Sequence, residues 1–247
     1  MMKNGEKSIG KLFDLVELIS SSRGGISGRD LSAASGIPVS TVFRMLKFLS
    51  GAGYVRARDG AYFLGTGFVR LGNIAREQNP LSSIARPVLE ELSAATMETV
   101  HLAELKDRRI IYVDKVEGVR PVRMGSMIGR TGPLYCTGVG KAILAFRPEP
   151  ERENLIAQME YLPFTAATIR SPEIMTREID RVRQAGFATD QCEHEEGVFC
   201  IAAPILDYRG FSIAAISVSG AEVYIRRDAE RLAGAVTAAA RRISEML

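Results

Sequence analysis

The sequence predicts an α+β chain in two parts: a small helical N-terminal domain that ends in a hairpin, and a larger C-terminal domain built on an antiparallel sheet. Three observations predict this class. Residues 8–49 carry apolar side chains at helical spacing, and two short strands follow over 54–58 and 61–64. Beyond residue 100 the apolar period changes to two. Between these parts, Pro80 disfavours helix at Asn79, which marks a boundary.

Charge is distributed unevenly along the 247 residues, a length that allows one or two domains with their own cores. Residues 1–79 carry 11 Lys and Arg against 6 Asp and Glu, whereas the remainder carries 21 against 23. The basic excess therefore lies in the N-terminal part, as phosphate binding requires.

The apolar runs and the cysteines indicate the cellular compartment of the protein. No apolar run approaches the ~20 residues that cross a bilayer, and the N-terminus is not typical of a signal peptide, so we expect no membrane partner. The three cysteines lack a C-x-x-C pattern. We therefore expect a reducing, cytoplasmic location without a disulfide framework.

The first helix is expected to begin after Ser8, a good N-cap residue, and to end in the stretch 20–25. Its apolar residues recur at helical spacing and should form the third wall of the N-terminal core. They are Ile9, Leu12, Phe13, Val16 and Ile19.

Two short helices around a tight turn follow. Ser27 is a good N-cap residue, and Asp30 three residues later resembles a capping box. Gly36 suits the left-handed residue that ends a helix, and Pro38 is tolerated in the first turn of the next one. This arrangement is the helix-turn-helix pattern.

The second of these helices has two different faces. Its apolar residues should face the core, and they are Val42, Met45, Leu46 and Leu49. Ser40, Thr41 and Arg44 lie on another side, where a helix in the major groove contacts base edges. Lys47 on the same side suits a phosphate. Phe43 is left with two alternatives: packing on the following hairpin or touching a thymine methyl group.

A basic hairpin completes the N-terminal domain. Asp59-Gly60 is a strong two-residue turn signal between strands 54–58 and 61–64. Arg56 and Arg58 are two residues apart, so they share one strand face and suit phosphates. A helix-turn-helix followed by such a hairpin is a winged helix. The alternative is a three-helix protein-interaction domain. DNA binding is favoured because turn, helix face and wing agree.

The chain beyond the hairpin divides at Asn79-Pro80. We predict a DNA-binding domain over residues 1–66, a linker helix over 67–80 where two subunits could pack, and a C-terminal domain over 81–247. In that domain, helices are expected over 81–97, 137–146, 152–161, 171–185 and 223–247, and strands over 100–104, 109–116, 121–124, 200–206 and 211–218.

Two separate blocks of sequence resemble the IclR family of transcriptional regulators. The N-terminal block runs from Ile37-Pro-Val-Ser-Thr-Val-Phe-Arg-Met-Leu46 to Tyr62-Phe-Leu-Gly65. The C-terminal block comprises Thr137-Gly-Val-Gly-Lys-Ala142 and the stretches 193–204 and 216–220. The resemblance implies a winged helix, a linker helix and a GAF-like effector domain. It also implies homodimers, often paired into tetramers, on operator DNA.

The resemblance also implies an effector site. Gly138 and Val139 would bind a carboxylate through backbone N–H groups at a helix N-terminus. The polar and apolar residues that would line the pocket are Met124, Asp190, Val198, Cys200, Ser217 and Ser219. Because a carboxylate beside Asp190 is repelled, either Asp190 accepts a bond from a ligand hydroxyl or amine, or it bonds to the backbone and faces away.

The strand residues give independent support for this site. Ser217 and Ser219 are two apart, so they point the same way, and buried hydroxyls need partners. A polar ligand would supply them; the alternative is that both serines bond to backbone in plain core. The apolar positions favour an acid with a hydrophobic or aromatic part.

Other patterns are weaker. Gly138–Lys141 is no P-loop, because Tyr135 and Ala142 stand where glycine and Ser or Thr are required. Cys192, His194 and Cys200 have no standard zinc spacing, which predicts free thiols and a surface histidine. His101 is expected on a strand edge without a role. The charged run 193–196 is expected to be a solvated turn that borders the pocket and could gate it.

The sequence thus predicts a ligand-responsive, DNA-binding transcription regulator without enzymatic activity, cofactor or metal. Two alternatives remain: an enzyme whose C-terminal domain acts on a small acid or thiol-reactive substrate, and a structural DNA-packaging protein. The second is disfavoured because the C-terminal part is large and acidic.

Overall fold

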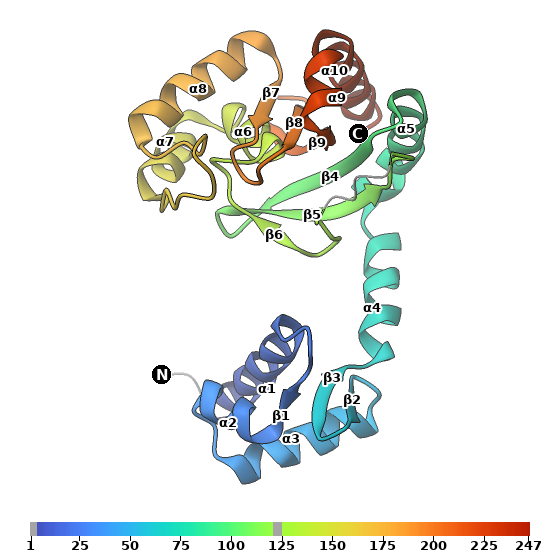
Figure 1. The fold of residues 1–247 in the computed structure, drawn as a ribbon, viewed down its shortest axis with the longest axis vertical. Coiled ribbons are helices and arrows are strands. Elements are labelled where there is room, and N and C mark those ends of the chain that lie inside the picture. Colours follow the sequence, from blue (N-terminus) through green and yellow to red (C-terminus); the bar gives the residue numbers. More distant parts are fainter. Residues whose placement is uncertain (1–3, 121–124) are drawn as a thin grey trace. The chain divides into compact units, whose positions relative to one another are not determined.

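A computed structural model describes residues 4–120 and 125–247. The chain divides into two compact units, Met1–Gln78 and Asn79–Leu247, and each is described by itself (Figure 1). The strand predicted over 121–124, together with Met124, lies outside the described residues.

The N-terminal unit is a winged helix-turn-helix. Its elements are α1 (Asn4–Ser21), β1 (Ile26–Ser27), α2 (Gly28–Ser35), α3 (Val39–Gly51), β2 (Val55–Arg58), β3 (Ala61–Leu64) and α4 (Thr66–Glu77). The three described strands form an antiparallel sheet in the order β1-β3-β2. The very short β1, which precedes α2, was not predicted.

Local chemistry places the turns as the sequence predicts. Ser27 Oγ accepts the Asp30 N–H at 3.1 Å and donates to the Asp30 carboxylate at 2.7 Å. Gly36 ends α2 in the left-handed conformation, with φ of 67°. Asp59 and Gly60 both have positive φ, as a type I′ hairpin turn requires. Pro38 precedes α3 as its N-cap residue instead of lying inside the first turn.

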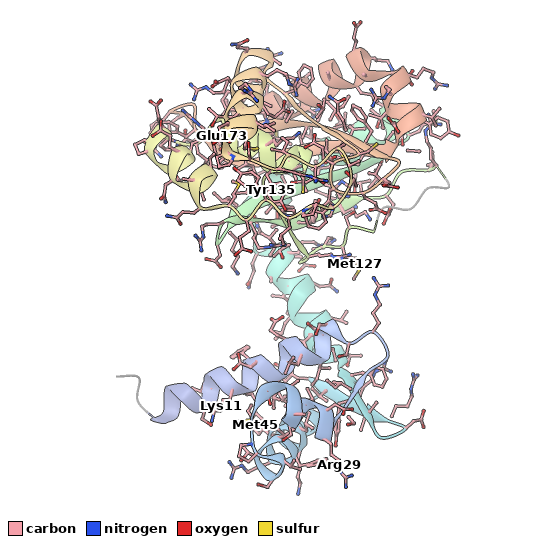
Figure 2. The ribbon with its side chains drawn as sticks, turned by 60° about the vertical axis from the view of Figure 1, so that its left-hand side comes forward. Lys11, Arg29, Met45, Met127, Tyr135 and Glu173 are labelled. Carbon is pink, nitrogen blue, oxygen red and sulfur yellow. The ribbon has the colours of Figure 1, made fainter. Side chains whose placement is uncertain are left out.

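The core of this unit lies between α1, α2 and α3. The four apolar residues predicted on α3 are buried, and Met45 lies among the helices (Figure 2). The expectation for α1 was partly wrong. The helix begins at Asn4, and Ile9 and Phe13 are 60% and 61% exposed. The apolar stripe of α1 is longer than the surface that α2 and α3 cover, so only its second half is buried.

The C-terminal unit is an antiparallel sheet with helices on both faces, which confirms the α+β prediction. Its elements are α5 (Pro80–Thr96), β4 (Thr99–Lys106), β5 (Arg109–Val116), β6 (Thr131–Gly132), α6 (Gly138–Ala145), α7 (Glu149–Gln158), α8 (Pro172–Ala185), β7 (Ala188–Gln191), β8 (Val198–Leu206), β9 (Ser212–Ala221), α9 (Glu222–Arg227) and α10 (Ala229–Glu245). The described strands run in the order β6-β5-β4-β9-β8-β7.

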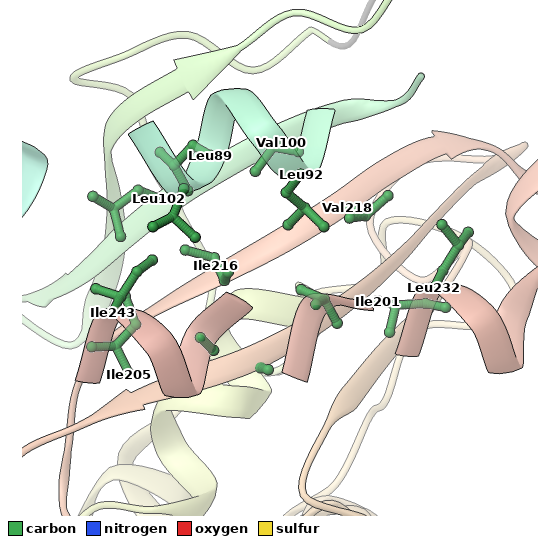
Figure 3. Packing of buried hydrophobic residues seen from close by; sticks show 14 of the residues in the cluster. Leu89, Leu92, Val100, Leu102, Ile201, Ile205, Ile216, Val218, Leu232 and Ile243 are labelled. Atoms are coloured by element: carbon green, nitrogen blue, oxygen red, sulfur yellow. The ribbon is translucent and has the colours of Figure 1, made fainter. Parts of the chain in front are cut away.

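The two faces of this sheet carry separate cores. On one face, α5 and α10 pack on strand residues such as Leu102, Ile216 and Val218 (Figure 3). On the other face, α6 and α8 pack on Ala103, Ala202 and other small residues. Because side chains alternate along a strand, Ser217 and Ser219 fall on the α6 side. The sheet therefore sends apolar side chains to one face and several polar ones to the other.

Element predictions in the C-terminal unit differ from the structure at the last helix and at short strands such as β7. The helix expected over 223–247 is broken at Asp228, whose φ of −106° and ψ of 20° separate α9 from α10. Strand β7 was missed because its four residues show no apolar alternation, and only pairing with β8 defines it.

Candidate DNA-binding surface and effector cavity

The polar face of α3 is open to solvent. Ser40, Arg44 and Lys47 are exposed and Thr41 is half-buried, while the opposite face of the helix is in the core. Arg29 near the start of α2 is also exposed (Figure 2). The helix thus presents short hydroxyls near its first turn and cations further along, as the sequence predicts.

Of the two alternatives for Phe43, the structure shows packing on the hairpin. Its ring meets Tyr62 edge to face, with centroids 6.5 Å apart. A Cβ on Gly28 would lie only 2.8 Å from the Phe43 ring, so a larger residue there would displace this ring. The ring keeps 44% of its surface exposed beside the polar face.

The wing carries two arginines on one face, as predicted. The guanidinium groups of Arg56 and Arg58 lie 5.5 and 5.0 Å from the centre of the Phe63 ring. Arg58 also lies 3.8 Å from the exposed carboxylate of Asp59. The shared aromatic ring orders both cations beside solvent.

In the C-terminal unit, the predicted effector residues surround one cavity of about 130 Å³. Those that line it are Gly138, Val139, Asp190, Val198, Cys200, Ser217 and Ser219. Strand register explains the convergence, because Asp190 pairs with Cys200 and Cys200 pairs with Ser219 across β7, β8 and β9. Residues directly opposite in antiparallel strands share a face, so these polar groups form a row.

The N-terminus of α6 borders the same cavity. Thr137 caps the helix by accepting the Gly140 N–H at 3.2 Å and donating to the Pro133 carbonyl at 2.7 Å. Gly138 lies directly over β8, where an added Cβ would be 3.3 Å from Ala202. The first residues of the helix, Gly138 and Val139, line the cavity, where the unpaired N–H groups of a helix N-terminus suit an anion.

His101 contradicts its predicted place on a strand edge. It lies on β4 in the interior of the sheet, is 3% exposed and lines the cavity. Burial, helped by the positive charge of Lys115, lowers the pKa of His101 to about 3, so the imidazole is neutral. The missed signal was register: His101 pairs with Ser217, which places it beside the serine pair.

Asp190 adopts neither of its two predicted arrangements in full. Its carboxyl accepts the Glu193 N–H at 2.8 Å and still lines the cavity. Burial, together with the charge of Glu193, raises the pKa of Asp190 to about 7. In its protonated form, which predominates below about pH 7, this carboxyl group neither repels a carboxylate nor needs a counter-ion.

A buried ion pair joins α6 to the segment after β7. Lys141 is fully buried, with its Nζ 2.5 Å from Glu193 and 3.1 Å from Glu178. Burial raises the pKa of Glu193 despite this partner. Glu193 is therefore not part of a solvated turn, as the sequence suggested, although Glu195 and Glu196 are exposed.

The cysteines and the second histidine differ in part from expectation. All three cysteines are free thiols. Burial raises the pKa of the Cys200 thiol well above its usual value, so it stays protonated. His194 is half-buried, stacks on Phe164 at 4.9 Å and lines the cavity, so it is not a plain surface residue. Within the described ranges, no group of three or more His, Cys, Asp or Glu could hold a metal ion.

A winged helix-turn-helix with a basic wing, carried on a chain with a separate cavity-bearing α+β unit, defines a class of DNA-binding regulators. Residues 8–59 match the IclR helix-turn-helix domain, and residues 75–245 match the C-terminal domain described as "Bacterial transcriptional regulator IclR C-terminal". The chain belongs to the IclR family of transcriptional regulators.

Named regulators are similar in sequence to this protein over most of the chain. It is 35% identical over 244 residues to the HTH-type transcriptional regulator KdgR of Dickeya chrysanthemi. The aligned residues cover 97% of this chain and 79% of the KdgR chain. It is 33% identical to KipR of Bacillus subtilis (strain 168), covering 92% and 91%. The crystal structure of IclR from Thermotoga maritima superposes with a TM-score of 0.75 at 30% identity, covering 97% of this chain and 99% of that one.

None of the described helices is both long enough and apolar enough to cross a membrane.

Proposed function

We propose that this protein is a cytoplasmic regulator that binds operator DNA as a homodimer or homotetramer, and that a small carboxylate in a GAF-like C-terminal domain modulates binding. The observation that carries the proposal is the family match over nearly the whole chain. The exposed polar face of α3 and the basic wing support the DNA-binding part. The cavity beside a helix N-terminus supports the carboxylate part.

The cavity favours a smaller and more polar acid than the apolar residues of the sequence suggested. Its volume of about 130 Å³ limits the ligand to roughly the size of a single ring, since a cavity of about 150 Å³ accepts benzene. Hydroxyl, carboxyl and imidazole groups line it, among them Thr131, Asp190 and His101. A short acid that carries hydroxyl or keto groups would satisfy more of these groups than an aromatic acid would.

A catalytic role for the C-terminal unit is disfavoured. The Cys200 thiol lies among buried groups that raise its pKa, so it is a poor nucleophile. The relatives named above are transcriptional regulators. Absence of turnover is therefore part of the proposal.

Exposed apolar side chains in the N-terminal unit support self-association. Ile9 and Phe13 lie one turn apart on α1, and Val69 and Ile74 are exposed on α4, which buries none of its residues. Helices with such unpaired apolar surface suit a two-fold interface. A dimer would place two α3 helices on the half-sites of a near-palindromic operator.

Replacing Arg44 by alanine tests the DNA-binding face. We expect Arg44→Ala to weaken operator binding by about 1–3 kcal/mol with little effect on random DNA, because base contacts carry sequence discrimination. Lys47→Ala, the matched control on the same face, should weaken both DNAs about equally and flatten the salt dependence. Fluorescence anisotropy at several salt concentrations measures both. An equal loss on operator and random DNA from Arg44→Ala would remove its base-reading role.

Replacing Ser217 and Ser219 together by alanine tests the cavity. We expect the double variant to fold and bind operator normally but to lose its response to the carboxylate that raises the melting temperature of the parent, since two donors are removed. Thermal-shift screening of short hydroxy and keto acids, with benzoate for comparison, identifies that carboxylate. An unchanged affinity in the double variant would place the effector site elsewhere.

A further inference from the structure

One imidazole connects the floor of the cavity to its wall. On β9, Ser217 Oγ and Ser219 Oγ lie 3.4 and 3.3 Å from His101 Nδ1, and 3.3 Å from each other. On the opposite side of the ring, His101 Nε2 lies 2.6 Å from Ser126 Oγ. Ser126 lines the cavity from outside the sheet, in the segment 125–130. Hydroxyl groups on two different walls therefore meet the two nitrogens of a single ring.

The state of this ring makes its two sides interdependent. His101 is buried, packs against the Tyr112 ring at 5.2 Å and is neutral. A neutral imidazole has one N–H donor and one acceptor nitrogen. Serine hydroxyls can donate or accept, so both tautomers fit the same heavy-atom positions. A change of role at Nδ1 requires the opposite change at Nε2.

We propose that His101 exchanges tautomer when a ligand binds in the cavity, and so transmits binding at Ser217 and Ser219 to Ser126. In the ligand-free protein a serine of β9 donates to Nδ1, and the Nε2–H donates to Ser126. When a carboxylate accepts the hydroxyl protons of Ser217 and Ser219, Nδ1 loses its donor. The ring proton then resides on Nδ1, facing the serine oxygens, and the Ser126 hydroxyl donates to Nε2.

This exchange conserves protons, because the imidazole carries one N–H and each serine one O–H in both states. The main chain of Ser126 is held by Lys115, whose Nζ donates to the Ser126 carbonyl at 2.8 Å. At Ser126, rotation of the hydroxyl therefore reverses its role without movement of the segment, while the ring proton leaves Nε2 and returns at Nδ1 by exchange with solvent protons. Since a ligand that brings its own donors leaves the serine hydroxyls free to donate to Nδ1, the relay separates carboxylates from amides of the same shape. The inference rests on the proposed carboxylate site.

The chain has two histidines, which makes a direct measurement possible. Full-length protein labelled with ¹⁵N at histidine reports the tautomer of each ring, and His194→Asn assigns the signals. We expect the Nε2–H tautomer of His101 in the free protein and the Nδ1–H tautomer in saturating acetate. Acetamide, the neutral probe of the same shape, should leave the tautomer unchanged.

Each outcome of this measurement is decisive. An Nδ1–H tautomer in the free protein overturns the proposal. If acetate shifts the backbone amide signals of Gly138 and Val139 while His101 keeps its tautomer, the relay is wrong and the carboxylate site stands. If acetate leaves these amides unchanged, the proposed carboxylate site fails and the relay fails with it.

Variants of Ser126 provide a second readout. We expect Ser126→Ala to weaken acetate binding about three- to tenfold, because Nε2 loses its partner. Ser126→Thr keeps the hydroxyl and should restore both affinity and the tautomer change. Thr176→Ala is the control, since it removes a hydroxyl that lies on α8 outside the cavity and donates to the Pro172 carbonyl at 2.9 Å. Unchanged acetate affinity in Ser126→Ala contradicts the proposal.

Discussion

Replacing Lys141 by methionine is expected to lower the free energy of unfolding of the C-terminal unit by about 3–5 kcal/mol, the usual cost of removing one partner from a buried ion pair. Methionine fills a similar volume but leaves the carboxylate of Glu193 buried without its cation, which lies 2.5 Å away in the parent. Glu178 keeps a partner, because Arg181 lies 2.8 Å from it. The loss therefore falls mainly on Glu193, whose second carboxylate oxygen already lacks a hydrogen-bond partner.

Chemical denaturation followed by circular dichroism measures this loss. Arg241→Met is the matched control, because it breaks an exposed pair with Glu245 on α10 and should cost at most about 1 kcal/mol. Adding Glu193→Gln to Lys141→Met should recover part of the stability, since it removes the uncompensated charge. A Lys141→Met variant as stable as Arg241→Met would show that the buried pair contributes little.

Patterns confined to one segment predicted the N-terminal unit well. The Ser27 cap, the left-handed Gly36 and the turn at Asp59-Gly60 depend on near neighbours in the sequence, and all three are confirmed. The extent of burial along α1 depends on which helices cover it, and periodicity alone does not report this. For that reason Ile9 and Phe13 were wrongly placed in the core.

The cavity was predictable where strand alternation or family motifs name its residues. Ser217 and Ser219 were found because they interrupt an apolar strand at period two. His101 and Glu193 were missed because their environment comes from register and from a partner far along the chain. His101 faces Ser217 through the pairing of β4 with β9, and Glu193 is buried against Lys141 of α6. Their chemistry is therefore a property of tertiary structure.

Carboxylate affinity is expected to fall as the pH rises through about 7, because Asp190 ionises beside the cavity at about that pH. Below this value Asp190 is neutral and an acetate ion binds without proton uptake. Above it, binding requires a proton, so the dissociation constant should rise up to about tenfold per pH unit. The same raised pKa makes the ligand-free protein less stable as the pH rises from about 4 to about 7, since the folded state binds the extra proton.

Several groups around Asp190 have shifted pKa values. Burial raises the pKa values of the Cys136 and Cys200 thiols and of Tyr112, so these stay protonated, and burial lowers the pKa of His194. Glu193 and Lys141 are the charged groups whose fields act on Asp190: the carboxylate raises its pKa and the ammonium group lowers it.

Asp190→Asn isolates this effect. Asparagine can still accept the Glu193 N–H but does not ionise, so we expect acetate affinity to become independent of pH between about 6 and about 8 and to exceed that of the parent at the upper end. Isothermal titration calorimetry in buffers of different ionisation enthalpy measures the affinity and, separately, the proton taken up by the parent. If Asp190→Asn keeps the parent's pH slope and proton uptake, another group controls anion binding and the neutral state assigned to Asp190 is wrong.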